Sequence, residues 1–187
     1  MHAAALRGFT RNLEAIPVVP ALRGQLNAWR VLDMGGQDVN GTVHGKLREI
    51  VDVGRLDVLD IEAGAGVTIV GDARKTDWWD GQPYDLVIST EMLEHLDGIG
   101  YAIGSAWKVL RPGGWFVGTC ASSGRAPHGA TGAPTPAPGE WYENVNPSDL
   151  SERLRAFDFD PIEVQYSYDT SEPHGAGDLY WRARRAG

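Results

Sequence analysis

Short apolar runs alternate with helical patterns along most of the chain. Residues 42–51 and 100–110 are expected to be helices, the second because its apolar side chains recur at helical spacing. Runs rich in Val, Ile, Leu and Phe predict buried strands at residues 31–33, 55–60, 67–70, 84–89 and 115–120. Strands that alternate with helices pair in parallel through right-handed crossovers, so the pattern predicts an α/β sheet.

The end of the chain breaks this alternation. Residues 161–168 and 178–184 form two strand patterns with no helix between them, so we expect them to pair as an antiparallel hairpin. With the earlier strands they predict a Rossmann-like, doubly wound, mostly parallel seven-stranded sheet. A chain of 187 residues suits one such domain over its whole length, 1–187.

Residues 1–28 precede the first predicted strand. Their alanine-rich start favours a helix, whereas Pro17 and Pro20 interrupt it. The segment is expected either to cap the sheet or to close over a cleft, and a partly ordered tail is the alternative.

Residues 121–146 form a long connection after the fifth strand, and 121–139 are rich in Gly, Pro, Ala and Ser. A domain linker is one interpretation, but too few residues follow for a second core. A long loop at the open end of a sheet is typical of a lid or substrate loop. The next helix is expected to begin with Asn146 as its cap and Pro147 in the first helical position.

Several predicted strands end in an acidic residue. Asp33 is followed by a loop that contains Gly35, Gly36 and Gly41, and glycine lets the backbone turn sharply and approach a ligand closely. Asp60 ends the second strand at a spacing of about 20 residues from this loop, as expected for an acid that binds ribose. Since the carboxyl ends of parallel strands share one edge, the sequence predicts a nucleotide cleft there.

The charge and composition narrow the classes of partner. The chain has a formal net charge of −8 and a pI of about 5.0, whereas tight binding of nucleic acid usually needs a basic surface. No apolar run approaches the ~20 residues that cross a bilayer, and no signal sequence is expected. The single cysteine, Cys120, suits a reducing compartment. We therefore expect a cytoplasmic protein with a small-molecule substrate and no membrane partner.

Five blocks in order resemble the motifs of the class I S-adenosylmethionine-dependent methyltransferases, in particular small stand-alone members that contain Leu-Glu-His-Leu. The blocks are VLDMGG, VLDIE, VGDAR, YDLVISTEMLEHL and WKVLRPGGWFVGT. The resemblance covers residues 29–120 and, in outline, the final hairpin. It implies S-adenosyl-L-methionine as cofactor and S-adenosyl-L-homocysteine as product.

The resemblance also implies where the cofactor binds. Asp33 and the two following glycines are expected at its amino acid end, Asp60 at the ribose, and Ile61 on the adenine face. Asp72 and the backbone of Ala73 are expected at the polar edge of adenine. The full set of expected cofactor-binding residues is Asp33, Gly35, Gly36, Asn40, Asp60, Ile61, Asp72, Ala73 and Glu91.

Asn40 marks a departure from the family pattern, which often has a third glycine where this chain has Gln37 and Asp38. Its amide either hydrogen-bonds the cofactor carboxylate or caps the following helix, and capping is the favoured interpretation.

The candidate chemistry lies just beyond the fourth strand. On a helical turn Glu91, Glu94 and His95 lie on one face, and an imidazole titrates near neutrality, so His95 is the best candidate for a general base. The same residues either anchor a helix beside the cofactor or hold a divalent metal ion. The E-x-x-E-H pattern resembles that of ubiquinone-pathway and small-RNA O-methyltransferases that use magnesium or manganese.

The RNA enzymes have a further histidine, for which His128 is the only downstream candidate before the last helix. His128 is also the candidate for a second base. The sequence pattern alone assigns no metal ligand.

The sequence therefore predicts an enzyme of EC class 2.1.1 that transfers a methyl group to an oxygen or nitrogen of a small molecule. The alternatives are a silent module or partner subunit that binds S-adenosylmethionine or a nucleoside, a methyltransferase that acts on nucleic acid, and an NAD-type oxidoreductase. The last lacks its G-x-G-x-x-G loop here. The oligomeric state is not indicated.

Overall fold

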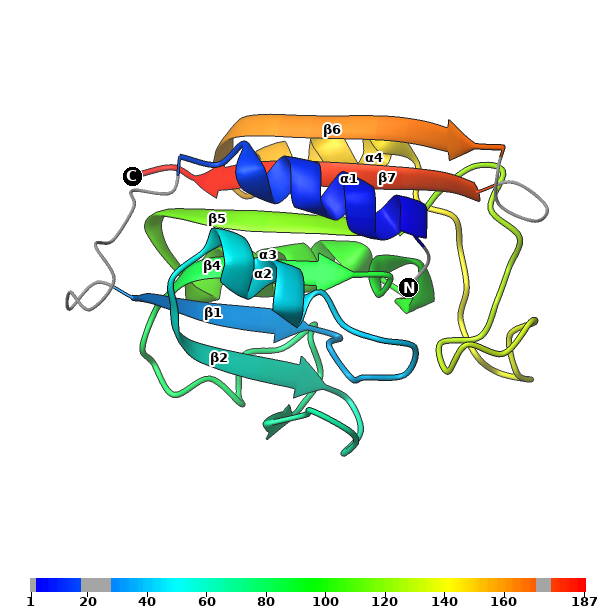
Figure 1. Ribbon diagram of the computed structural model, residues 1–187, viewed down its shortest axis with the longest axis horizontal. Coiled ribbons are helices and arrows are strands. Elements are labelled where there is room, and N and C mark those ends of the chain that lie inside the picture. Colours follow the sequence, from blue (N-terminus) through cyan, green and yellow to red (C-terminus); the bar gives the residue numbers. More distant parts are fainter. Residues whose placement is uncertain (1–2, 18–27, 171–175) are drawn as a thin grey trace.

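The protein is built around one seven-stranded sheet with the order β3-β2-β1-β4-β5-β7-β6 (Figure 1). The computed structural model describes residues 3–17, 28–170 and 176–187. The strands are β1 (Trp29–Met34), β2 (Val53–Asp60), β3 (Ile69–Val70), β4 (Tyr84–Thr90), β5 (Leu110–Ala121), β6 (Phe159–Asp169) and β7 (Ala176–Arg185). The first five pair in parallel, whereas β7 pairs antiparallel with both β5 and β6. The predicted fold class is confirmed.

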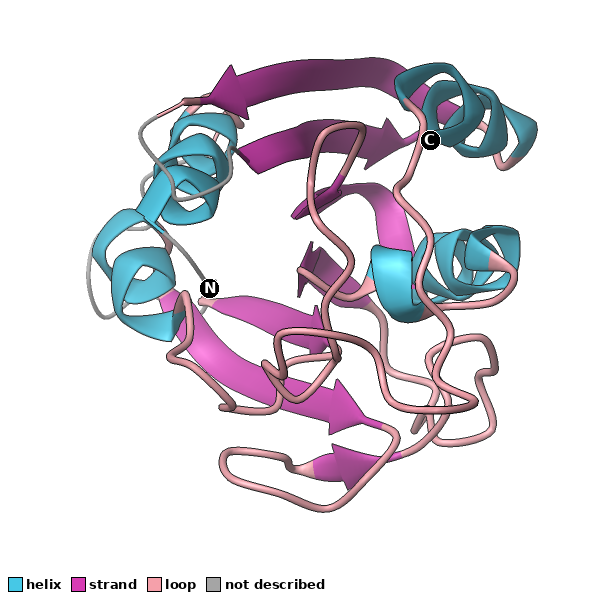
Figure 2. Cartoon of the chain, turned by 90° about the vertical axis from the view of Figure 1, so that its right-hand side faces the viewer, coloured by secondary structure: helices cyan, strands magenta, loops and turns pink. Residues whose placement is uncertain are grey.

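Helices cover both faces of the sheet (Figure 2). The α-helices are α1 (Ala3–Glu14), α2 (His44–Ile50), α3 (Ile99–Val109) and α4 (Pro147–Ala156), and one 3₁₀ turn, η1, spans Leu93–His95. Phe9 of α1 and Leu47 of α2 pack with Val31 and Val117 on one face. Ile103 of α3 packs into a second buried cluster on the other face. Each strand of the centre is thus buried from both sides, as its apolar sequence predicts.

Three local expectations are settled by the structure. The lead-in segment contains a helix, α1, that packs on β5 and β7, so it caps the sheet; residues 18–27, including Pro20, lie outside the described residues. The carboxamide oxygen of Asn146 accepts a hydrogen bond from the Ser148 backbone N–H at 2.9 Å, which confirms the predicted cap of α4. The third strand is shorter than expected, because only Ile69 and Val70 pair with β2.

The boundary between α3 and β5 differs from the sequence prediction. The turn expected at 111–114 belongs to β5, which begins at Leu110, immediately after α3 ends. Gly113 adopts a positive φ of 78° there, and the register with β4 shifts between Tyr84 and Leu86. An irregular strand start thus replaces the predicted free turn.

The order of the strands fixes where a ligand can bind. From β1 the chain adds β2 and β3 on one side, then returns to place β4 on the other side of β1. The loops after β1 and β4 therefore diverge at the carboxyl edge of the sheet, where a crevice forms. In the described part of the chain, no helix has the length and apolar character needed to cross a membrane.

Gly118 tests the packing of the sheet centre. An added Cβ would lie 2.2 Å from the Ser89 backbone oxygen and 2.3 Å from Cζ2 of Trp181. Because neither neighbour is a flexible chain end, Gly118→Ala is expected to lower the free energy of unfolding by about 1–3 kcal/mol or more. The matched control Gly45→Ala, whose Cβ would meet open space in α2, is expected to be neutral or stabilising by up to about 1 kcal/mol. Urea denaturation measures both, and equal stabilities would contradict this account of the core.

Candidate functional site

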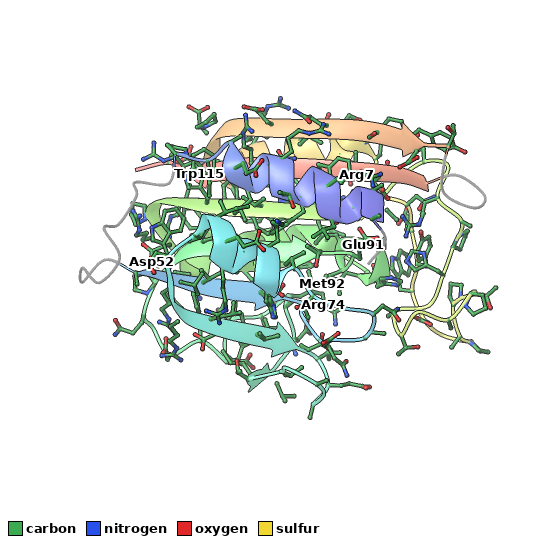
Figure 3. The ribbon with its side chains drawn as sticks, in the orientation of Figure 1. Arg7, Asp52, Arg74, Glu91, Met92 and Trp115 are labelled. Carbon is green, nitrogen blue, oxygen red and sulfur yellow. The ribbon has the colours of Figure 1, made fainter. Side chains whose placement is uncertain are left out.

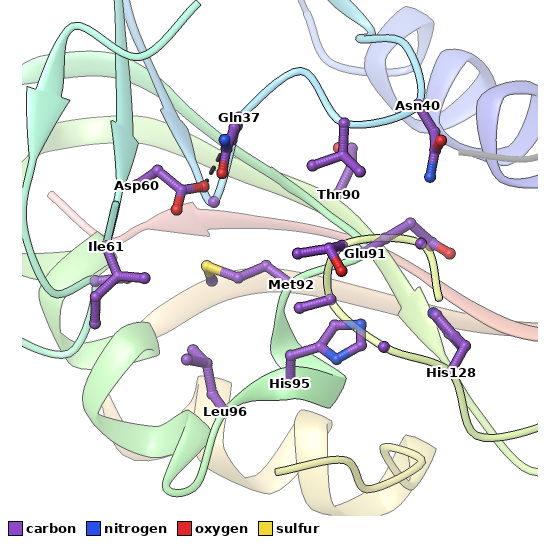
Figure 4. A pocket seen from close by; sticks show the side chains of 18 of the residues that line it. Gln37, Asn40, Asp60, Ile61, Thr90, Glu91, Met92, His95, Leu96 and His128 are labelled. Carbon is purple, nitrogen blue, oxygen red and sulfur yellow. Dashed lines mark hydrogen bonds between the residues drawn. The ribbon is translucent and has the colours of Figure 1, made fainter. Parts of the chain in front are cut away.

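A cavity of about 750 Å³ lies at the carboxyl edge of the sheet. Its walls come from the glycine loop after β1, the tip of β2, the loop after β3, the segment after β4 and the long loop after β5. Figure 4 shows Asp60 and Ile61 toward one end, His128 toward the other, and Met92 between them. Figure 3 shows Arg74, Glu91 and Met92 near this edge and Asp52 near the opposite edge of the sheet.

Asp33 is an almost fully buried carboxylate at the tip of β1. Its Oδ2 lies 2.7 Å from Nε2 of His44, while its Oδ1 has no hydrogen-bond partner among the described residues. Burial raises the pKa of Asp33, and the neighbouring His44 opposes this rise. Asp33 therefore keeps one acceptor oxygen unused beside the cavity.

The glycine loop is shaped by close approach to its neighbours. An added Cβ at Gly36 would lie 2.5 Å from both Cγ and Oδ2 of Asp33. At Gly35 it would lie 2.5 Å from Cγ of Met92, and φ is +74°. Only glycine fits these two positions without displacing the acid or the methionine.

Asp60 and Ile61 form the wall at the tip of β2. Oδ2 of Asp60 accepts a hydrogen bond from the Gln37 backbone N–H at 3.2 Å, as drawn in Figure 4. Ile61 is 61% exposed although it is strongly apolar. A carboxylate next to an exposed apolar face can bind a ligand that has both hydroxyl groups and a flat ring.

Asp72 lines the cavity but is already engaged by Arg74. The Arg74 side chain donates to both carboxylate oxygens, at 2.9 and 3.0 Å, and its backbone N–H donates at 2.9 Å. Arg74 holds the pKa of Asp72 below its ordinary value. Ala73, which also lines the cavity, is buried beside it. The only signals for this ion pair in the nearby sequence are the basic residues two and three positions later, Arg74 and Lys75.

Glu91 holds a strained backbone conformation just after β4. Its φ is +57°, in the left-handed region that non-glycine residues seldom occupy. Oε1 accepts a hydrogen bond from the Thr119 hydroxyl at 2.7 Å, and Oε2 lies 3.4 Å from Nη2 of Arg125. The predicted helical turn is correct for 93–95 but wrong for Glu91, which precedes η1 in this other conformation.

Glu94, His95 and His128 meet at the other end of the cavity. Oε1 of the fully buried Glu94 accepts a hydrogen bond from the Ala121 backbone N–H at 2.9 Å. The rings of His95 and His128 meet edge to face with centroids 5.0 Å apart, and the Tyr142 ring contacts both. One potential ligand atom from each of the three residues lies within 4.8 Å of the others. The fold thus brings His128 to the E-x-x-E-H segment.

The surroundings shift the pKa values of two of these residues in opposite directions. Burial, with a contribution from the charge of Glu91, raises the pKa of Glu94 to about 8. Burial and the neighbouring His128 lower the pKa of His95 to about 4. An imidazole of such low pKa stays neutral at physiological pH and is a weak general base.

Asn40 does not cap α2, so the favoured interpretation of its role was wrong. The cap position of α2 is Val43, with no side-chain hydrogen bond. Asn40 instead lines the cavity opposite the long loop, since a Cβ at Gly132 would lie 2.3 Å from its Nδ2.

Arg125 is a residue of the site that the motifs in the sequence did not predict. Its guanidinium donates to Oδ1 of the buried Asp178 at 2.8 Å and lies beside Glu91, so it ties the start of the long loop to β7. A signal was present, because Arg125 is the one Asp, Glu, Lys or Arg residue within 121–139.

All the sequence-predicted site residues line the same cavity: Asp33, Gly35, Gly36, Asn40, Asp60, Ile61, Asp72, Ala73, Glu91, His95 and His128. Their individual roles remain predictions.

Comparison with known sequences identifies the class of protein. Residues 10–164 match the family described as methyltransferase domain. Because the match covers well over half of the chain, the protein belongs to this methyltransferase family. No curated protein matches the chain.

Solved structures share the fold at low sequence identity. A Haloferax volcanii chain described as a putative methyltransferase, in complex with the Trm112 methyltransferase activator, is 14% identical with a TM-score of 0.67, over 98% of this chain and 91% of that chain. The Burkholderia thailandensis 1,6-didemethyltoxoflavin-N1-methyltransferase, with its acceptor and S-adenosylhomocysteine bound, is 19% identical with a TM-score of 0.63, over 98% and 79%.

A third structure is longer than this protein. The Haemonchus contortus phosphoethanolamine N-methyltransferase 2, in complex with S-adenosyl-L-methionine, is 15% identical with a TM-score of 0.59 over 88% of this chain. The match spans 50% of that chain, so this protein corresponds to about half of its length. At these identities the likeness establishes the fold alone.

Glu94→Gln is expected to change the pH dependence of stability. The unfolded carboxyl titrates near 4.5 and the native one near 8, so between these values the native state binds more protons and the wild-type free energy of unfolding falls as pH rises. The neutral amide removes this fall. In urea denaturation with a chelator present, the variant should therefore match the wild type near pH 4.5 and exceed it near pH 8.

Several titratable and polar groups face Glu94 and remain in the variant: Glu91, His95, Cys120, Arg125, His128, Tyr142 and the backbone N–H of Ala121. Glu152→Gln, at an exposed position on α4, is the control and should leave the pH profile unchanged. Parallel curves for wild type and Glu94→Gln would contradict the raised pKa.

Proposed function

We propose that this protein transfers the methyl group of S-adenosyl-L-methionine to an oxygen or nitrogen atom of a small-molecule acceptor. The observation that carries the proposal is one cavity of about 750 Å³ with two chemically different ends. Buried and half-buried carboxylates with a glycine loop line one end, and a cluster of histidines with Glu91 and Glu94 adjoins the other. Such a cavity holds a charged cofactor and an acceptor side by side.

The cofactor occupies the end formed by β1 and β2. The unused oxygen of Asp33 and the loop at Gly35 and Gly36 bind its amino acid part. The carboxylate of Asp60 accepts hydrogen bonds from the ribose hydroxyls, and the exposed Ile61 packs on the adenine. Charge-assisted hydrogen bonds of this kind are about twice as strong as neutral ones.

The polar edge of adenine lies against Asp72 and Ala73. Arg74 donates two hydrogen bonds to Oδ1 of Asp72, from its backbone N–H and from Nε, but only one to Oδ2. Because a carboxylate oxygen accepts two hydrogen bonds, Oδ2 can also accept one from the adenine amino group. Arg74 fixes the orientation of that acceptor before the cofactor binds.

The reaction is an in-line displacement at carbon. A lone pair of the acceptor forms the new bond to the methyl carbon, the carbon–sulfur bond breaks, and its electron pair stays on sulfur to give neutral S-adenosyl-L-homocysteine. The acceptor proton leaves to a base or to solvent. Because the sulfonium is already activated, the protein mainly orients and desolvates the reactants, which can supply about 7–11 kcal/mol of the barrier.

The acceptor occupies the end formed by His95, His128 and the long loop. Residues 125–134 of that loop line the cavity, so the loop serves as a lid over the acceptor. The acidic balance of the chain favours a small molecule over a nucleic acid. The acceptor named for the Burkholderia thailandensis enzyme is such a molecule, which supports the same class here.

A partner-dependent subunit is the second candidate function. The observation that favours it is the Haloferax volcanii chain of similar length, whose structure is a complex with the Trm112 methyltransferase activator. In this case the protein binds the cofactor but transfers the methyl group only when a partner is present.

Asp60→Asn is expected to weaken binding of S-adenosyl-L-homocysteine by at least about tenfold, because two hydroxyl groups lose a charged acceptor. Isothermal titration calorimetry measures the dissociation constant. The control is Asp52→Asn at the opposite edge of the sheet (Figure 3), which should leave it unchanged. An unaltered affinity in Asp60→Asn would remove the ribose assignment.

Turnover is tested with S-adenosyl-L-methionine and a panel of hydroxyl and amine acceptors. Mass spectrometry is expected to detect a methylated acceptor and an equal amount of S-adenosyl-L-homocysteine. Tight cofactor binding without any turnover would favour the partner-dependent subunit, and no affinity for either form of the cofactor would refute the proposed function.

A further inference from the structure

The cluster of Glu94, His95 and His128 has the composition and spacing of a metal site. The three side chains each present one donor atom, and these atoms lie within 4.8 Å of one another. Glu94 is fully buried and the His95 side chain is only 9% exposed, so their donors are fixed by packing. Small side-chain movements bring three such atoms to bonding distance from one ion.

Two donor atoms of the cluster are buried and unused. Oε2 of Glu94 and Nδ1 of His95 have no hydrogen-bond partner among the described residues. The nearest acid to Nδ1 is Glu140, whose Oε1 is 3.9 Å away, too far for a hydrogen bond. A buried polar atom without a partner costs about 1–3 kcal/mol, and such atoms call for a ligand that satisfies them.

Packing alone does not explain this arrangement. The edge-to-face contacts among His95, His128 and Tyr142 account for the ring positions, but they leave Oε2 of Glu94 without a partner among the described residues. A free general base does not explain it either, because that role needs only one of the three side chains, whereas donor atoms of all three converge.

We infer that Glu94, His95 and His128 bind one divalent transition-metal ion, which ties the long loop to the η1 turn over the acceptor end of the cavity. Two imidazole nitrogens and one carboxylate oxygen suit Mn²⁺, Fe²⁺ or Zn²⁺, whereas Mg²⁺ prefers oxygen ligands. Because His128 lies on the loop and the other two ligands lie on η1, the ion also closes the loop.

The site narrows the acceptor class, and this step rests on the proposed function. An ion held by Glu94, His95 and His128 would supply Lewis acidity to an acceptor hydroxyl, and the hydroxyl proton would leave to solvent. The acceptor oxygen would form the bond to the methyl carbon, and the electron pair of the broken carbon–sulfur bond would stay on sulfur. The acceptor is therefore an alcohol or phenol, and methylation occurs on oxygen.

Binding is tested with Mn²⁺ and Zn²⁺ separately, by calorimetry on the full chain after removal of metals by a chelator. One ion per chain is expected, and Mg²⁺ should bind more weakly. Changes to residues that only support metal ligands usually weaken metal binding by about 10- to 100-fold. Loss of a ligand itself should therefore weaken binding by at least that much. The variants are His128→Ala and Glu94→Gln, and the control is Glu152→Gln on the exposed face of α4.

Both ligand variants are chosen to stay folded. His128 lies on a surface loop, and Glu94→Gln replaces a buried ionisable group with a neutral amide while keeping the acceptor for the Ala121 N–H. Retained affinity for S-adenosyl-L-homocysteine checks their folding. No binding of either ion to the wild type, or equal binding in wild type and both variants, would overturn the inference.

Hydrogen exchange reports the closing of the loop. Mn²⁺ is expected to slow exchange at residues 126–134 in the wild type and to leave it unchanged in His128→Ala. Uniform rates in the wild type with and without the ion would overturn the loop role.

These readouts separate the inference from the proposed function. Metal binding without cofactor affinity would refute only the proposed methyl transfer, whereas methyl transfer that survives exhaustive chelation would refute only the role of the metal in the reaction.

Discussion

The reversal of strand order between β1 and β4 is the constraint on which the site depends. Because the chain builds outward to β3 and then returns across β1, the segments after β1 and β4 leave the same edge in different directions. The space between them cannot be filled by either helix layer. The fold alone therefore places Asp33 and Glu91 on one cavity, although they lie far apart in the sequence.

A buried carboxylate lies at or beside each end of the cavity, and among the described residues one of its two oxygens has a hydrogen-bond partner and the other has none. At the first end Asp33 uses Oδ2 with His44, and at the second Glu94 uses Oε1 with the Ala121 backbone. Both arrangements are costly in the free protein, since burial raises both pKa values. Stability given up in this way is recovered when a ligand supplies the missing partner.

The sequence predicted the parts of the site that follow from strand ends. An acid or glycine at the tip of a parallel strand reaches the ligand edge whatever the tertiary details are, so Asp33, Gly36 and Asp60 were found from pattern alone. Arg74 and Arg125 were not, because ion pairs depend on side-chain reach in three dimensions. The contact between His128 and His95 was not predictable for the same reason, because it depends on the path of a loop that has no periodic sequence pattern.

The same limits explain the differences in the fold. The length of β3 depends on how many of its residues pair with β2, and the early start of β5 depends on its pairing with β4. Neither property is encoded in the hydrophobic pattern of the strand itself. The cap of α4 was predictable because it involves residues only two positions apart, whereas the supposed cap of α2 failed because the glycine loop carries Asn40 toward the long loop.

The long loop connects the end of β5 to the start of α4, and it contributes no strand to the sheet. Its length and composition can therefore diverge between relatives without shifting the register of any neighbouring strand. The strand tips around Asp33 and Asp60 lack this freedom, because their positions are set by the central ladder. Over evolutionary time, the two ends of the cavity are thus free to change at different rates, with new acceptors arising on an old cofactor scaffold.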